Sequence, residues 1–472
     1  MLFNSYTFLW FLPLSLLIYW SASRCSLRLQ NVLLLALSYV FYGWWDVRFL
    51  ALIVGITAIG YLSALGMEAM SNRPKVRHAV STLGAFKYYN FFVTELTAAF
   101  RQFGWSTHLP VWHVLLPVGI SFFTFQTVSY IIDVRRGRLP ACHDAVGYAA
   151  FISFFPQLVA GPIERATDLL PQMLHRRHLD YGDAADGCRL ILWGLFKKMV
   201  LADRCAPYVD IVYSNPTASG ADLWTATVLF AFQIYGDFSG YSDVAIGTAR
   251  LFGIRLTRNF ALPFFSRNVP ELWRRWHISL MNWFKDYVYI PLGGSRHGRL
   301  RQLRNVCLVF LLSGLWHGAN WTFIGWGFFQ LFGFLPFILL SLSKRQRTAI
   351  VAEGRCLPSL RESVEMLSTF LFFCLGWVLF RSESIHAALV RLWTMCTENP
   401  LSHPFCGWAA FLPPLVVIGM EWATRQRRHA LDFPAGSLMA RHRTLRWTVY
   451  YILIFCILYF GGAQVQFIYF QF

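Results

Sequence analysis

Charged side chains are scarce in this chain of 472 residues. They make up 14% of the sequence, against roughly 25% in an ordinary soluble domain, while 56% of the residues are hydrophobic. Among the charged residues, the acidic ones are the fewer. The chain has 24 Asp and Glu and 42 Lys and Arg, which gives a formal net charge of +18. The basic residues form short clusters between apolar runs, as in cytoplasmic loops that face anionic lipid headgroups. We therefore expect the positive charge to interact with the lipid bilayer and not with nucleic acid.

Metal-binding and disulfide patterns are also missing. The ten cysteines form no Cys-x-x-Cys pair, and several lie inside apolar windows, which favours thiols packed between helices. His175 and His178 have a spacing that could hold a metal, but two arginines separate them, so a solvated basic loop is favoured. We expect no metal and no bound cofactor. No repeat and no matching halves are evident, which counts against transporters built from inverted repeats.

Long uncharged windows are abundant. A helix of ~20 residues crosses a hydrocarbon core of about 30 Å, and these windows do not alternate as the strands of a membrane barrel do. We predict an all-α polytopic integral membrane protein with about eleven transmembrane helices. No Lys or Arg precedes the first window, so we expect a membrane helix there and not a signal peptide. The windows span residues 4–23, 29–45, 49–67, 102–132, 223–236, 305–343, 366–380, 399–420 and 447–472.

Two regions are expected not to make a single crossing. Basic clusters flank residues 145–163 on both sides, and Pro156 and the Gly161-Pro162 pair would interrupt a helix, so we predict a re-entrant segment. Basic clusters also flank residues 305–343, so we predict a hairpin of two crossings with both ends in the cytoplasm.

The hairpin window contains no Asp, Glu, Lys or Arg and a single histidine, His317, in the string Trp316-His317-Gly318-Ala319-Asn320-Trp321. Helix from Asn305 to this histidine would reach about 18 Å, just past mid-membrane. Ionisable groups at that depth mark functional sites, and imidazole exchanges a proton near neutral pH. A core histidine bonded to a backbone carbonyl is the structural alternative, but we favour a general base.

A second histidine, His277, lies in the string Trp273-Arg274-Arg275-Trp276-His277. An interfacial helix would explain the first three residues well and the histidine poorly. In the functional interpretation, Arg274 and Arg275 bind the phosphates of an acyl donor, to which guanidinium groups are suited, and both tryptophans line the same donor site.

A third string, Gln233 to Asp243, interrupts apolar sequence with two acids and two serines. It could be a turn in which Asp237 and Ser239 cap a break and Ser242 or Asp243 begins a helix to Leu251. In the functional interpretation, Asp237 or Asp243 orients a catalytic imidazole or an arginine in a cavity. A fourth string, from Lys285 to Gly294, is interpreted as structural.

Together these strings resemble the membrane-bound O-acyltransferase superfamily, and within it the AlgI-type polysaccharide O-acetyltransferases of bacteria. Tyr42-Gly43-Trp44-Trp45 and residues 86–91, 116–122 and 155–163 resemble further family segments in the expected order. The resemblance covers most of residues 1–340, and the rest matches in hydropathy alone. Residues 78–91 depart from the family, because they are too short for the helix usually found there.

The resemblance implies a single membrane domain over residues 1–472, with a catalytic core at 110–340 and C-terminal helices at 360–472. It implies a multi-pass acyltransferase of the bacterial inner membrane that moves an acetyl group from acetyl-CoA to an exported polysaccharide, directly or through a periplasmic partner protein. His317 corresponds to the family's catalytic histidine and His277 to its companion. The expected supporting residues are Asp237, Asp243, Ser239, Tyr241, Asn320, Trp316 and Trp321.

Three alternatives stay open at this point. A teichoic acid D-alanyltransferase would share the site but take its acyl group from a carrier protein. A transporter would perform no covalent chemistry, and a scaffold of a polysaccharide secretion complex would tolerate substitution of both histidines.

Overall fold

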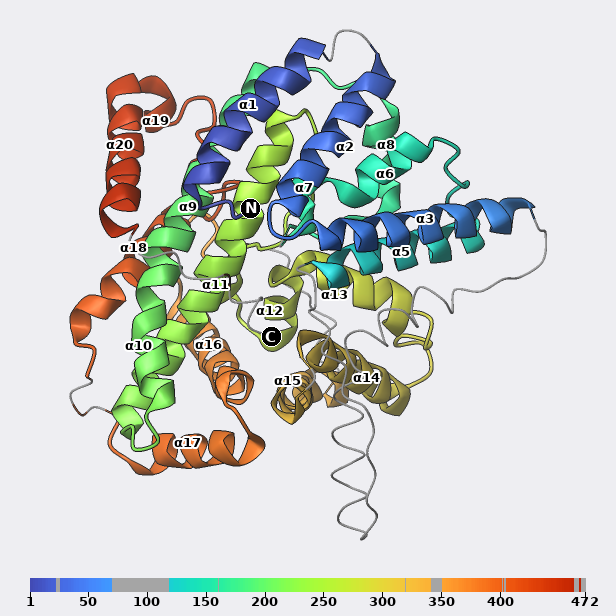
Figure 1. Cartoon of the computed structure of the whole chain (residues 1–472). Helices are drawn as coiled ribbons and strands as arrows, with labels where there is room; N and C mark the ends of the chain where they lie inside the picture. The colour runs from blue at the N-terminus through green and yellow to red at the C-terminus, as the bar shows by residue number, and fades with distance from the viewer. Residues whose placement is uncertain are drawn as a thin grey trace. The chain divides into compact units, whose positions relative to one another are not determined.

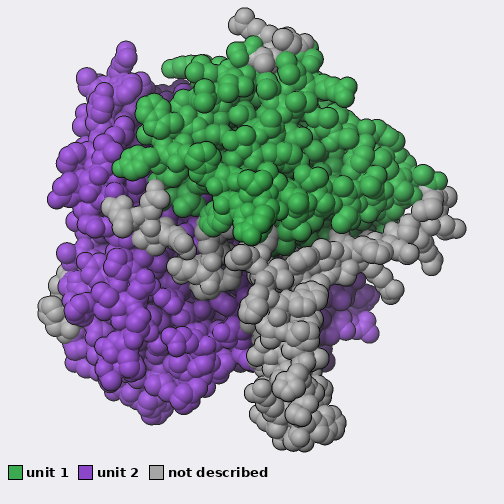
Figure 2. Space-filling model, in the orientation of Figure 1, with its two compact units in different colours: residues 1–184, 249–257 green, residues 185–248, 258–472 purple. Residues whose placement is uncertain are grey.

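The computed structural model describes residues 1–22, 26–69, 119–159, 161–318, 320–340, 350–400, 402, 405–461 and 467. Within these residues every regular element is a helix, which confirms the all-α prediction (Figure 1). They form two compact units, residues 1–184 with 249–257 and residues 185–248 with 258–472 (Figure 2). Two of the three boundaries fall inside helices, α9 (Tyr181–Phe196) and α11 (Gly220–Leu251), and the third follows Thr257 in the connection after α11.

Unit 1 is built around α2, which packs against α1, α3, α6 and α7. Aromatic side chains fill the space between these helices. The ring centroid of Phe41 lies 6.1 Å from that of Phe8 and 5.0 Å from that of Phe155. The helices are α1 (Tyr6–Ala22), α2 (Leu27–Gly43), α3 (Arg48–Ala69), α5 (Ile120–Arg135), α6 (Ala145–Ser153), α7 (Phe155–Leu158) and α8 (Ala166–Leu174).

Unit 2 holds the long helices α9 and α11 and the hairpin of α14 and α15. The other α-helices of the unit are α10 (Asp203–Ser214), α12 (Val269–Arg275), α13 (Ile278–Phe284), α14 (Arg299–His317), α15 (Trp321–Leu339), α16 (Leu360–Arg381), α17 (Ile385–Thr397), α18 (Leu412–Ala423), α19 (Leu438–Arg441) and α20 (Arg443–Phe460). The segments η1 (Lys197–Ala202) and η3 (Lys285–Tyr289) are π-helices, and η2 (Pro263–Phe265) and η5 (Trp408–Phe411) are 3₁₀ turns.

Four described helices, α3, α15, α16 and α20, are long and apolar enough to cross a membrane, and α1 and α2 are apolar but shorter. Each of them overlaps a predicted window. The window at 102–132 lies partly outside the described residues, and the segment 78–91 lies wholly outside them.

The predicted crossing over residues 399–420 is wrong in extent. The helical part begins only at the turn Trp408–Phe411 and continues as α18 to Ala423. Two prolines, Pro413 and Pro414, open α18, where the absence of their N–H groups costs no intrahelical hydrogen bond. A helix across the earlier part of the window would have had to carry them in its interior, which proline disfavours.

The predicted interruption of residues 145–163 is present. Helix α6 ends at Ser153, the short α7 follows with Pro156 in its first turn, and the chain turns again before Gly161. Phe154 and Phe155 are fully buried at this break. Non-helical backbone is therefore enclosed by protein here, as a segment at membrane depth would require.

The predicted solvated loop around His175 and His178 is wrong for Arg177. Both histidines are exposed, but Arg177 is buried. Its Nε donates to the Tyr19 hydroxyl over 2.7 Å, and its Nη2 donates to the Asn31 carbonyl oxygen over 2.6 Å. These hydrogen bonds connect the segment after α8 to α1 and α2, and they compensate for the removal of the guanidinium group from water.

The helical hairpin predicted within residues 305–343 is present as α14 and α15, which lie side by side (Figure 1). Glycines allow their backbones to approach. A Cβ atom on Gly314 would lie 2.2 Å from the carbonyl oxygen of Phe323, and one on Gly327 would lie 2.3 Å from that of Phe310. The pair therefore packs more closely than larger residues would permit, as is common between membrane helices.

Glycines also bring α9 and α11 together in unit 2. A Cβ on Gly194 would lie 2.5 Å from the carbonyl oxygen of Gly240, and one on Gly247 would lie 2.5 Å from that of Gly187. We predict that Gly194→Ala lowers the midpoint of thermal unfolding in detergent, because overpacking costs about 1–3 kcal/mol. Gly419→Ala on α18 is the control, since nothing lies within 4 Å of its Cβ position. Equal midpoints for the two variants would contradict close α9–α11 packing.

Glu164 should make the stability of unit 1 depend on pH. Burial raises the pKa of this carboxyl to about 7, and Thr257 donates to its Oε1 from both the backbone N and the side-chain Oγ1. Ionisation in the folded state is therefore unfavourable, and the penalty grows between pH 4.5 and about 7.

We predict that Glu164→Gln, which keeps the acceptor oxygen, raises the unfolding midpoint at pH 8 and leaves it unchanged near pH 4.5. The shift corresponds to at most about 3 kcal/mol. A thermal-unfolding series of both proteins in detergent tests this, and an equal difference at every pH would contradict the assignment.

Candidate active site

His317 is the last residue of α14, at the turn of the hairpin. Its side chain is 8% exposed, and its ring centroid lies 5.2 Å from that of Trp326 on α15 and 5.1 Å from that of Phe380 on α16. Three helices therefore enclose the imidazole in aromatic surface. An enclosure of this kind lowers the local dielectric constant and strengthens the polar interactions made inside it.

His277 occupies the turn between α12 and α13 and is 1% exposed. Its backbone is left-handed, with φ 45° and ψ 53°, a conformation that few residues other than glycine adopt. The edge of its ring meets Phe238 of α11 at a centroid distance of 4.6 Å. Its Nδ1 lies 3.1 Å from the side-chain oxygen of Asn259.

The two histidines share one neighbour, Trp316. Its indole centroid lies 5.9 Å from the ring of His277 and 4.8 Å from the ring of His317. Residues 40 positions apart in the chain are thus gathered around one indole in unit 2. The structure brings together the two imidazoles that the sequence analysis selected.

Trp273 and Trp276 belong to the interior of unit 2. Both are buried, and the ring centroids of Trp276 and Trp377 are 5.7 Å apart. Trp273 donates from Nε1 to the side-chain oxygen of Gln330 over 3.3 Å. The interpretation of this segment as an interfacial helix is therefore wrong for Trp273, because the apolar area of an indole is better covered by the surrounding rings.

The two arginines of the string differ in their surroundings. Arg275 donates to the buried carboxylate of Glu271 over 2.9 Å and to the carbonyl of Ala261. Arg267 pairs with the same carboxylate over 3.1 Å. Arg274 is exposed and forms no salt bridge within the part of the chain that the structure describes. Of the two, Arg274 is thus the better placed to meet an anion from solvent.

The acids of α11 pair with lysines. Asp243 lies 2.7 Å from the Nζ of Lys197, which also donates to Ser239 over 2.9 Å. Asp237 accepts from Lys198, whose ammonium group also donates to Asp203 over 2.7 Å. Buried charges require such compensation. The ion pairs thus link the acids to η1. The sequence analysis proposed an imidazole or an arginine as the partner of these acids, and the structure pairs them with lysines.

The predicted helix break at residues 237–243 is wrong, because α11 continues unbroken from Gly220 to Leu251. Short polar side chains were expected to cap a helix, but within this helix they serve as partners for buried groups. Ser239 accepts a hydrogen bond from Lys197, and Ser242 accepts one from the side-chain amide of Asn259 over 3.3 Å. Tyr241 packs against Phe467 at a ring centroid distance of 4.8 Å.

Asn320 and Trp321 begin α15. The side chain of Asn320 accepts from the backbone N–H of Thr322 over 3.0 Å, a helix cap, and Trp321 is exposed. Ala319 lies outside the described residues. Of the supporting residues predicted in this string, Trp316 alone contacts both histidines.

Sequence reasoning missed three residues of this region. Asn259 contacts His277 directly, and Lys197 and Lys198 neutralise the acids of α11. A pair of lysines in an otherwise apolar segment could have indicated buried acids nearby. Asn259 carried no such signal, because asparagine is an ordinary residue in the connection after a helix.

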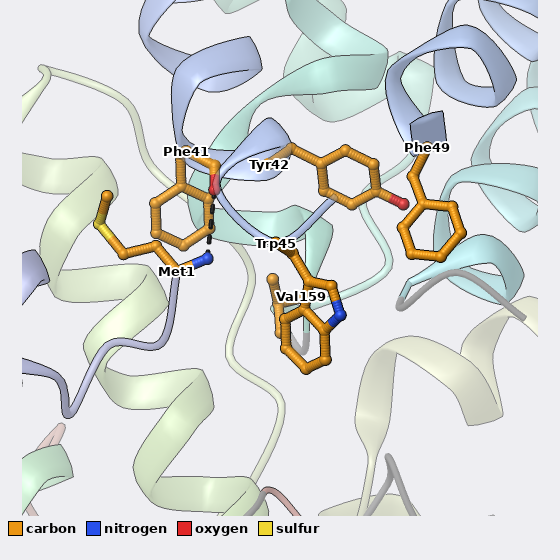
Figure 3. A pocket seen from close by; sticks show the side chains of 6 residues that line it. All are labelled: Met1, Phe41, Tyr42, Trp45, Phe49 and Val159. Atoms are coloured by element: carbon orange, nitrogen blue, oxygen red, sulfur yellow. Dashed lines mark hydrogen bonds between the residues drawn. The ribbon is translucent and has the colours of Figure 1, made fainter. Parts of the chain in front are cut away.

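Two other features offer no further chemistry. Unit 1 contains a small pocket whose lining is apolar apart from an amine and a phenol (Figure 3), formed by Met1, Phe41, Tyr42, Trp45, Phe49 and Val159. Among the described residues, no group of three or more His, Cys, Asp and Glu side chains is placed to hold a metal.

Known proteins resemble the chain over most of its length. The model of the membrane-bound O-acyltransferase family (MBOAT) matches residues 136–349, a range that contains both histidines. The chain is 40% identical over 398 residues to a probable alginate O-acetylase AlgI of Pseudomonas aeruginosa, covering 82% of this chain and 73% of that protein.

Two more distant relatives carry different names. A peptidoglycan O-acetyltransferase of Helicobacter pylori is 35% identical over 440 residues, covering 85% of this chain and 81% of that protein. A teichoic acid D-alanyltransferase of Streptococcus thermophilus is 30% identical over 231 residues, covering 46% of this chain and 55% of that protein. As the sequence motifs predicted, the chain belongs to the membrane-bound O-acyltransferase family of multi-pass membrane proteins.

Proposed function

We propose that this protein transfers an acetyl group from cytosolic acetyl-CoA to hydroxyl groups of an exported polysaccharide. The observation that carries the proposal is that His277 and His317 are both buried and both contact the indole of Trp316. Two buried imidazoles gathered around one side chain are suited to proton transfer during acyl transfer. The similarity to a probable alginate O-acetylase supports acetyl as the acyl group.

In the proposed reaction, His317 accepts the proton of the acceptor hydroxyl. The hydroxyl oxygen attacks the thioester carbonyl, a new C–O bond forms, and the C–S bond breaks. The proton then passes from the imidazolium to the departing thiolate, so that coenzyme A leaves as a thiol. General-base catalysis of this kind contributes about 10²–10⁴-fold, and holding donor and acceptor together supplies much of the remainder.

The donor is proposed to enter from the cytoplasmic side, where Arg274 binds its phosphates. This arginine is exposed, whereas Arg275 is held by Glu271. Guanidinium groups bind phosphate oxygens in a bidentate fashion, which suits a donor rich in phosphate.

The acceptor is proposed to arrive from the periplasmic side of the inner membrane, directly or through a partner protein. A hairpin with cytoplasmic ends would hold His317 near mid-membrane, between the two substrates. The proposal includes about eleven membrane-spanning helices, a re-entrant segment at residues 145–163, and one membrane domain that contains both compact units.

D-alanyl transfer from a carrier protein is the second candidate. It is favoured by matches to two teichoic acid D-alanyltransferases, which cover 46% and 59% of this chain. Activity with acetyl-CoA would argue against it. A transporter or a scaffold without covalent chemistry remains an outcome of the test below.

We predict that His317→Ala and His277→Ala abolish O-acetylation of the cell-surface polysaccharide at normal protein level in the membrane. Proton NMR of polysaccharide from each strain measures the acetyl content, and the expected loss for His317→Ala is about 10²–10⁴-fold in rate. His178→Ala is the matched control, since that histidine is exposed. Unchanged acetylation in both variants would overturn the catalytic assignment and favour a transporter or a scaffold.

We predict that Arg274→Ala and Arg275→Ala have different effects. Loss of Arg274 should raise the KM for acetyl-CoA by about tenfold, the value of one hydrogen bond to a charged group. Loss of Arg275 should instead lower thermal stability, because the buried Glu271 loses one of its two cations. Steady-state kinetics and unfolding midpoints in detergent distinguish the two, and equal KM values for wild type and Arg274→Ala would contradict the donor site.

A further inference from the structure

Asn259 is the buried residue that holds His277 in place. It is fully buried in the connection between α11 and α12, and its side-chain oxygen lies 3.1 Å from Nδ1 of His277. The same oxygen accepts from the backbone N–H of Ser279 over 3.2 Å and from its hydroxyl over 3.0 Å. Three donors thus converge on one carbonyl oxygen.

The chemistry of these contacts fixes the orientation of the amide. The backbone N–H of Ser279 can only donate, so the amide atom that faces it must be the oxygen. The amide nitrogen then points to Ser242 and donates to its hydroxyl over 3.3 Å. The opposite orientation, with the amide oxygen and nitrogen exchanged, is therefore excluded.

The orientation of the amide determines the tautomer of His277. A carbonyl oxygen has no hydrogen to give, so Nδ1 must carry the hydrogen in this contact. In the neutral imidazole the lone pair is then on Nε2. This Nε2 is buried and has no hydrogen-bond partner within the described residues, a condition uncommon for buried polar atoms.

Asn259 also supports the backbone of His277. Its own carbonyl accepts from the N–H of Ile278 over 2.9 Å, directly after the left-handed residue. Two residues on, the N–H of Ala261 donates to the carbonyl of Arg275 over 2.9 Å. Left-handed conformations of residues other than glycine persist where their surroundings enforce them, and they cluster at active sites.

We propose that Asn259 is a positioning residue, which presents the Nε2 lone pair of His277 to the acceptor polysaccharide. A neighbouring hydroxyl of the same sugar would donate its hydrogen to Nε2, and this contact would orient the reacting hydroxyl, whose own hydrogen stays available for removal by His317. The inference rests on the proposed acyl transfer and adds a residue to it.

Asn259→Asp and Asn259→Ala test this role in membrane vesicles that contain the full chain. The donor is acetyl-CoA, and the acceptor is the polysaccharide that loses its acetyl groups in the His317→Ala strain. Asn259→Asp keeps the acceptor oxygen but places a negative charge beside the imidazole, which favours its protonated form. Asn259→Ala removes the acceptor. Ser242→Ala is the control, because it removes the other hydrogen bond of the amide and leaves the oxygen in place.

We expect the two Asn259 variants to differ in how their kcat depends on pH. Asn259→Asp should approach the wild-type kcat at high pH, with the acid limb of its kcat–pH profile displaced upward by one pH unit or more. Asn259→Ala should lose kcat at every pH, by tenfold or more, with the KM for acetyl-CoA unchanged. Ser242→Ala should keep the acid limb of the wild type.

Two results would overturn the proposal separately from the proposed function. One is an equal, pH-independent loss in both Asn259 variants at normal protein level, which would indicate a merely structural role. The other is wild-type kcat in Asn259→Ala. Absence of acetyl transfer by the wild type itself would instead overturn the proposed function, and the role of Asn259 with it.

Discussion

The close packing of α14 against α15 is the constraint on which the candidate site depends. Gly314 and Gly327 bring each helix against the carbonyl oxygens of the other, at distances that no side chain could occupy. This approach brings Trp326 of α15 against the ring of His317. A wider hairpin would leave room for lipid or water around the imidazole, and its aromatic enclosure would be lost.

Buried charge is the second constraint on unit 2. The buried cations Lys197 and Lys198 of η1 and Arg267, which precedes α12, each pair with an acid, and the acids come from α10, α11 and α12. Removing a charge from water is costly unless it is paired, so these contacts act as constraints on how the helices can meet. The acids of α11 therefore help to assemble the unit, and in the proposed mechanism proton transfer falls to the two histidines.

The two histidines are held in place by different kinds of interaction. His317 is the last residue of α14, and aromatic rings surround it. His277 lies in a turn stabilised by hydrogen bonds from Asn259. One imidazole is thus placed by packing and the other by polar contacts. Trp316 touches both, so a change in either arrangement would be transmitted to the other through a shared side chain.

Much of the fold was predictable from the sequence, because helices that cross a membrane must be apolar along their whole length. The hairpin at 305–343, the interruption near Pro156 and the apolar helices α1, α2, α3, α16 and α20 follow from that requirement together with the positions of basic residues. The extent of α18 did not, because hydropathy does not record where a helix can begin.

The sequence by itself determined the family and the two candidate histidines, since these depend on residue types in local strings. The tertiary structure alone decided which side chains meet. It paired Asp237 and Asp243 with lysines, buried Trp273 and Trp276 in the interior, and placed Asn259 against His277. The physical reason is that a buried polar group pairs with whichever group lies next to it in the folded chain. The partners found here are 18 to 46 positions apart, and the order of residues does not show that they will be neighbours.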